Sequence, residues 1–129
     1  MGRNGVVEVL IADDNGLFRT AVDAILEAEP ALRVVGRATD GEEAVRLVAE
    51  LEPDVVLMDL SMPVLDGFVA TRRIQEESPA TRVLVLTGSP ERTDIARAEA
   101  AGAAGYVTKD RIATDLVEAI LTLVGPKAL

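Results

Sequence analysis

The chain has 129 residues, and its 13 basic and 22 acidic side chains give a net charge of −9 at pH 7. Because it contains neither cysteine nor histidine, it cannot form a disulfide, a thiolate or imidazole zinc site, a histidine-dependent triad or a phosphohistidine. The acidic balance also argues against direct binding of nucleic acid, because the phosphates would be repelled.

Short apolar runs alternate five times with longer segments of helical pattern. Continuous apolar runs such as Val-Val-Leu-Met are typical of parallel strands that are covered on both faces. The expected strands are Val6–Ala12, Leu32–Ala38, Asp54–Met58, Arg82–Leu86 and Ala104–Thr108. The expected helices lie near residues 16–29, 41–52, 67–77, 91–101 and 112–124. This alternation predicts one α/β domain with right-handed crossovers.

Several helix boundaries carry their own signals. Asp40, Asp66 and Ser89 each precede an expected first helical turn and are residue types that cap helix N-termini. Gly102 and Gly125 follow expected last turns, where glycine commonly ends a helix.

The length fits a single domain in the usual range of ~100–150 residues. No apolar run approaches the ~20 residues that would span a membrane, and the N-terminus lacks the apolar stretch of a secretory signal. We therefore expect a cytoplasmic protein without membrane contact.

Polar side chains follow the carboxyl ends of the expected strands, which is where open α/β sheets bind ligands. In chain order they are Asp13-Asp14, Thr39-Asp40, Asp59, Thr87 and Lys109. Among them, the carboxylates of Asp13, Asp14 and Asp59, the Thr87 hydroxyl and the Lys109 ammonium are expected to meet at one edge of the sheet.

The expected cluster of Asp13, Asp14 and Asp59 needs compensating charge. Two carboxylates 4 Å apart repel each other by ~1–4 kcal/mol, depending on the effective dielectric. Mg²⁺ is a hard cation that takes one or two carboxylates together with water and phosphate oxygens. Together with Lys109 it would balance the three negative charges, and a carboxylate so neutralised can attack phosphorus.

Four segments of the chain resemble the receiver domain of two-component response regulators. They are Ile11-Ala12-Asp13-Asp14-Asn15, Val56-Leu57-Met58-Asp59-Leu60-Ser61-Met62-Pro63, Val85-Leu86-Thr87 and Gly105-Tyr106-Val107-Thr108-Lys109-Asp110. The resemblance covers residues 6 to about 124 and is closest to the subfamily with a C-terminal LuxR-type helix-turn-helix domain. It implies a flavodoxin-like (βα)5 fold whose five-stranded parallel sheet has the order 2-1-3-4-5.

The resemblance also implies roles for the residues of the cluster. Asp59 would accept the phosphoryl group, while Thr87 and Lys109 would each contact a phosphoryl oxygen. Tyr106 would be a rotamer switch coupled to Thr87; the alternative is that its side chain serves only for packing.

A metal site is implied as well, for Mg²⁺ or Mn²⁺. Asp14 and Asp59 would bind the ion directly, Asp13 would bind it through water, and the backbone carbonyl of Ser61 would add a ligand. Asn15 replaces the His or Gln that often follows the acidic pair, and it stands where a helix N-cap is expected.

The implied partner is a sensor histidine kinase, in a magnesium-dependent phosphorelay. Residues 1–129 would be a single receiver domain that catalyses only its own phosphorylation and dephosphorylation, so it would not be an enzyme in the usual sense. Phosphorylation would switch an output, expected to be transcription through a DNA-binding domain that is absent from this chain. A homodimer could form on phosphorylation, and the receiver itself would not contact nucleic acid.

Two helices have unusual apolar patterns. Segment 91–101 has Ile95 as its only large apolar residue, so it gains little from burial and could shift on modification. In segment 16–29 the apolar residues cover roughly 200°, more than the ~100° of a core face. Either that helix is deeply buried, or Leu17 and Ala24 flank a docking face for the kinase.

Other functions on the same fold remain alternatives. A flavin-type module is disfavoured because Asp13-Asp14 stands where a phosphate-cradling hydroxyl or glycine loop is needed. A stand-alone, phosphorylation-independent interaction module is disfavoured by the complete cluster. A magnesium-dependent phosphohydrolase lacks a second aspartate two residues after Asp59, where Ser61 stands.

Overall fold

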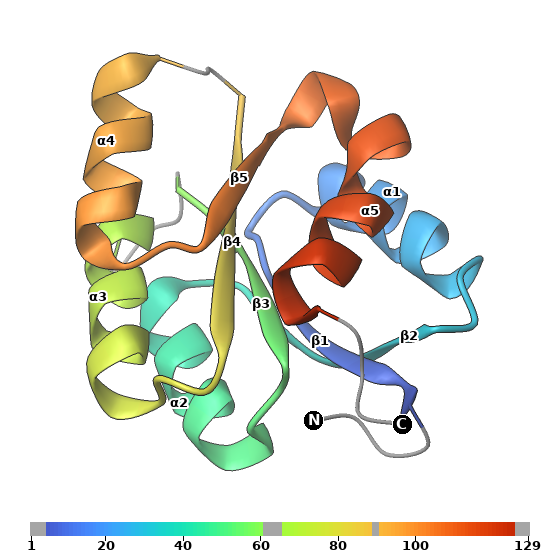
Figure 1. Ribbon diagram of the computed structural model, residues 1–129, viewed down its shortest axis with the longest axis horizontal. Helices are drawn as coiled ribbons and strands as arrows, with labels where there is room; N and C mark the ends of the chain where they lie inside the picture. The colour runs from blue at the N-terminus through green and yellow to red at the C-terminus, as the bar shows by residue number, and fades with distance from the viewer. Residues whose placement is uncertain (1–4, 61–65, 89–90, 126–129) are drawn as a thin grey trace.

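The computed structural model describes residues 5–60, 66–88 and 91–125. Five parallel strands form one sheet in the order β2-β1-β3-β4-β5 (Figure 1). The strands are β1 (Val7–Ala12), β2 (Leu32–Ala38), β3 (Val55–Asp59), β4 (Arg82–Thr87) and β5 (Gly105–Thr108). The expected fold and strand order are confirmed.

Five α-helices cover the two faces of this sheet. They are α1 (Gly16–Glu27), α2 (Gly41–Leu51), α3 (Gly67–Glu77), α4 (Arg92–Ala101) and α5 (Ile112–Val124). Helices α1 and α5 lie on one face, and α2, α3 and α4 lie on the other (Figure 1). A 3₁₀ turn, Lys109–Arg111, joins β5 to α5. The element boundaries fall within two residues of those expected from the sequence.

The apolar runs of the strands supply two cores at once. In β1, Val9 and Ile11 belong to the core beneath α1 and α5. Leu10 and Ala12 belong to the core beneath α2 and α3. Successive side chains of a strand point to opposite faces, so a run that is apolar throughout is buried on both sides.

The described helix termini follow the predicted signals. The side chains of Asp40 and Asp66 accept hydrogen bonds from backbone N–H groups inside α2 and α3. Gly102 ends α4 in the left-handed conformation, with φ of 107°.

The predicted cap at Ser89 lies outside the described residues. The N-cap of α4 is Glu91, whose carbonyl accepts the first helical hydrogen bond, from Ile95 N–H. The Glu91 side chain itself makes no capping hydrogen bond.

Helix α4 is held by little apolar surface, as its sequence predicts. Its buried residues are Ala98 and Ala101. The Arg97 guanidinium adds a contact with α3, because it lies 3.8 Å from the centre of the Phe68 ring.

Helix α1 is not deeply buried, so the first interpretation of its wide apolar arc is wrong. Val22 and Leu26 face the core, whereas Leu17 is 87% exposed. Ala21 and Ala24 are exposed as well. Leu17, Ala21 and Ala24 form an apolar stripe on the outer side of the helix, which we call the α1 stripe.

Gly67, the first residue of α3, packs directly against the end of β3. A Cβ at this position would lie 2.7 Å from the Asp59 carbonyl oxygen and 2.8 Å from the Leu60 Cα atom. We expect Gly67→Ala to lower the free energy of unfolding by about 1–3 kcal/mol, because backbone must move to admit the methyl group. Urea unfolding measures the change.

Gly16 offers a matched control because it is the first residue of α1, and a Cβ there meets no atom within 4 Å. Gly16→Ala should be neutral or stabilise the fold by about 0.4–1 kcal/mol. An equal decrease in the free energy of unfolding of Gly67→Ala and Gly16→Ala would contradict the close contact between Gly67 and β3.

Candidate functional site

Three carboxylates meet at the carboxyl edge of the sheet. Asp13 and Asp14 follow β1, Asp59 ends β3, and these two strands are paired neighbours. One carboxylate oxygen of each residue lies within 4.8 Å of the others. Asp13 and Asp59 are only 0% and 2% exposed, while Asp14 faces solvent.

Asp13 is the most constrained of the three. Its Oδ1 accepts a hydrogen bond of 2.7 Å from the Asn15 N–H. Within the described part of the chain, its Oδ2 is the one buried side-chain atom without a hydrogen-bond partner. Burial raises the pKa of the Asp13 carboxyl to about 6, and the nearby charge of Asp59 adds to the rise.

Lys109 supplies a positive charge at this edge. Its Nζ lies 3.1 Å from Asp59 Oδ2. Thr87 is buried at the end of β4, the strand that lies between β3 and β5. Asp13, Asp14, Asp59, Thr87 and Lys109 therefore all lie at the same edge of the sheet, as the sequence predicts.

Two further predicted residues need separate mention. Ser61, whose carbonyl is expected to bind metal, lies outside the described residues. Tyr106 lies on β5 and pairs with Val85, two residues before Thr87. Its side chain is 45% exposed, so the inward turn implied by the resemblance would start from this outward position.

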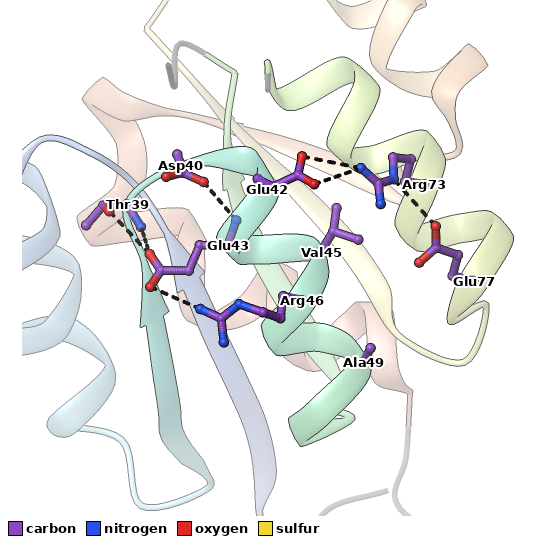
Figure 2. A pocket seen from close by; sticks show the side chains of 9 residues that line it. All are labelled: Thr39, Asp40, Glu42, Glu43, Val45, Arg46, Ala49, Arg73 and Glu77. Carbon is purple, nitrogen blue, oxygen red and sulfur yellow. Dashed lines mark hydrogen bonds and ion pairs between the residues drawn. The ribbon is translucent and has the colours of Figure 1, made fainter. Parts of the chain in front are cut away.

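The polar residues after β2 serve a different purpose. Asp40 Oδ1 accepts from Glu43 N–H, and Glu43 Oε1 accepts from Thr39 N–H. The side chains of Asp40 and Glu43 therefore cap the start of α2. They line a charged groove between α2 and α3, shown in Figure 2. The groove's Arg73 pairs with Glu42 and Glu77.

The expected Asn15 cap of α1 is confirmed, because its side chain accepts from the N–H groups of Leu17 and Phe18. The sequence interpretation did not foresee two further contacts of α1 at the site. Arg19 Nη1 donates to the Asp13 carbonyl oxygen at 3.1 Å, and Lys109 Nζ lies 4.7 Å from the centre of the Phe18 ring.

Comparison with known proteins decides the family. The sequence model of the response regulator receiver domain matches residues 9–121. The chain belongs to this family. The receiver is 42% identical over 115 residues to the response regulator GacA of Pseudomonas aeruginosa, covering 89% of this chain and 54% of GacA. The chain thus spans about half the length of that relative.

Receivers are joined to different outputs among the relatives. The protein-glutamate methylesterase/protein-glutamine glutaminase 1 of Myxococcus xanthus is 40% identical over 109 residues, which are 84% of this chain and 31% of that protein.

In the described parts of this receiver, no helix is long and apolar enough to cross a membrane.

Solved structures share the fold. The receiver domain of the response regulator NarL from Mycobacterium tuberculosis is 35% identical, with a TM-score of 0.88 and coverage of 92% of this chain and 96% of that one. The receiver domain of the sensor histidine kinase PA1611 from Pseudomonas aeruginosa holds a magnesium ion in its active-site cleft. It is 30% identical, with a TM-score of 0.83 and coverage of 93% and 98%.

The acidic cluster of this receiver fits a divalent cation. All three side chains offer carboxylate oxygens, the ligands that Mg²⁺ prefers. The buried Asp13 Oδ2, which has no hydrogen-bond partner, is an acceptor that a metal-bound water would satisfy.

The same geometry predicts that the cluster costs stability in the absence of metal. The raised pKa of Asp13 means that its ionised form is disfavoured in the folded state. Asp13→Asn keeps an oxygen for the Asn15 N–H and removes the buried charge. We expect this variant to raise the free energy of unfolding by about 1–3 kcal/mol at pH 7 in a chelating buffer.

Excess Mg²⁺ should raise the free energy of unfolding of the original protein by more than it raises that of the Asp13→Asn variant. The control is Asp110→Asn, which removes the same charge from an exposed residue beside Lys109 and should change stability by no more than about 0.5 kcal/mol. A lower metal-free stability of Asp13→Asn would contradict the repulsion among the carboxylates.

Proposed function

We propose that this receiver accepts a phosphoryl group on Asp59 from the phosphohistidine of a sensor histidine kinase, in a magnesium-dependent reaction. The observation that carries the proposal is the setting of Asp59. Its carboxylate is buried at the end of β3, 3.1 Å from the Lys109 ammonium and within 4.8 Å of two further carboxylates. The chain contains no histidine of its own, so a phosphohistidine has to come from the partner.

The transfer follows from the placement of these groups. An Asp59 oxygen attacks phosphorus, the phosphorus–nitrogen bond breaks, and the imidazole leaves with the electron pair and takes up a proton. Lys109 remains beside the carboxylate and offsets the charge of the phosphoryl oxygens, and the Thr87 hydroxyl donates to one of them. Phosphoryl transfer depends chiefly on such positioning and charge stabilisation.

We further propose that the cluster holds Mg²⁺ or Mn²⁺. Asp14 and Asp59 would bind the ion directly, Asp13 would bind it through water, and the backbone carbonyl of Ser61 would complete the set. When bound, the ion supplies positive charge to the phosphoryl oxygens. The donor types and the buried Asp13 oxygen support this assignment.

The α1 stripe is the surface that we propose for kinase docking. Leu17 is 87% exposed, and it lies in the first turn of α1, two residues beyond the Asn15 cap that follows the acidic pair. Such an exposed leucine beside alanines suits contact with another apolar helix face. A kinase bound there would present its histidine to the cytoplasmic receiver at the carboxyl edge of the sheet.

For the output we propose regulation of transcription through a DNA-binding domain C-terminal to the single receiver domain of residues 1–129. Phosphorylation would draw Thr87 toward the phosphoryl group and let Tyr106 turn inward. The weakly packed α4 would respond, and a homodimer would form through α4, β5 and α5, or through α1 and α5. This output is supported by a relative, the transcriptional regulatory protein LiaR of Bacillus subtilis, which is 40% identical over 115 residues.

Labelling of the protein tests the central assignment. With Mg²⁺ and a small phosphodonor such as acetyl phosphate, we expect one phosphoryl group per chain, as a base-labile acyl phosphate. Asp59→Asn should take up none, because no other carboxylate of the cluster ends a strand beside Lys109. Intact-mass spectrometry measures the uptake. The control Asp110→Asn should label normally, and equal labelling of Asp59→Asn would refute the assignment.

A further inference from the structure

The Lys109 ammonium is held from two sides. On one side, its Nζ lies 3.1 Å from Asp59 Oδ2. On the other, it lies 4.7 Å from the centre of the Phe18 ring, within the ~6 Å over which a cation is attracted to an aromatic face. Phe18 belongs to the first turn of α1, whereas Lys109 follows β5 at the opposite end of the chain.

The Phe18 side chain is itself well fixed. Its backbone N–H donates to Asn15 Oδ1 at 3.2 Å, within the N-cap of α1. Its side chain is partly buried and packs against the core beneath α1 and α5. The ring therefore presents a rigid surface to Lys109. The Lys109 side chain is only 26% exposed.

We propose that Phe18 is a positioning residue for phosphoryl transfer, because its ring holds the Lys109 ammonium at the Asp59 carboxylate. This inference rests on the proposed function of Asp59. A lysine side chain has four rotatable bonds and a strongly hydrated head, so an ammonium at the edge of the site would otherwise spend part of its time in solvent. Phe18 does not touch the reacting atoms and acts only through Lys109.

A purely structural role would give a different result from a positioning role. Leucine or methionine at position 18 would still pack against the core, but neither has an aromatic face for the ammonium. Tyrosine would keep that face. The chain also provides a matched control, because Phe68 makes the same kind of contact with Arg97, at 3.8 Å, on the other side of the sheet.

The experiment compares the rates of Asp59 phosphorylation by acetyl phosphate at saturating Mg²⁺. We expect Phe18→Leu and Phe18→Met to lower the rate by about two- to fivefold, the range of a partly exposed cation–π contact. Phe18→Tyr and the control Phe68→Leu should stay near the original rate. In a Lys109→Ala background, Phe18→Leu should cause no further loss.

A second readout does not depend on phosphorylation. An aromatic face shifts the resonances of protons that lie above it, and the chain has only two lysines, Lys109 and Lys127, so the Lys109 ε-methylene signal is readily assigned with Lys109→Ala. This signal should be shifted upfield in the original protein and in Phe18→Tyr. It should return to the free-lysine position in Phe18→Leu and Phe18→Met.

The outcomes separate this inference from the proposed function. The inference is overturned if both Phe18→Leu and Phe18→Met label at the original rate while Asp59→Asn stays unlabelled. It is also overturned if Phe18→Leu slows labelling equally with and without Lys109, or if the methylene signal is unshifted. If the original protein takes up no phosphoryl group, or Asp59→Asn takes up as much, the proposed function fails, whereas the methylene signal still reports the Phe18 contact.

Discussion

The repulsion among three carboxylates at one edge of the sheet is the constraint on which the site depends. Asp13 and Asp59 are withdrawn from water, so their charges are costly, and Lys109 offsets only part of them. Burial raises the pKa of Asp13 accordingly. The apolar cores on both faces of the sheet stabilise a fold that tolerates this cost. The remaining imbalance supports the proposals that the edge holds a cation and that Asp59 is phosphorylated.

The surroundings of the site divide into firmly and weakly held parts. The α1 terminus is fixed by the Asn15 cap and by the Arg19 contact with the Asp13 carbonyl. Helix α4, by contrast, buries only alanines, and Arg97 adds a contact with Phe68. A firmly held edge beside a weakly packed helix supports the proposal that modification at this edge alters the surface of α4.

The sequence predicts the sheet and the acidic cluster because both follow from local patterns. Apolar runs end at polar residues, and parallel strands bring those ends to one edge. The apolar arc of α1 left open whether Leu17 is buried or exposed, and the contact between Phe18 and Lys109 could not be predicted in this way. Both depend on the direction in which the first turn of α1 faces the sheet, which is a tertiary property.

Paramagnetic relaxation by Mn²⁺ tests most directly whether the carboxylate edge is the cation site. Substoichiometric Mn²⁺ should broaden the amide resonances of Asp13, Asp14 and Asp59 first, and excess Mg²⁺ should restore them. The amide resonances of the charged groove between α2 and α3 should stay sharp, because Arg73 in this groove already pairs with Glu42 and Glu77. Broadening centred on Glu42 and Glu77, with the resonances of the three aspartates unaffected, would contradict a metal site built on carboxylate repulsion.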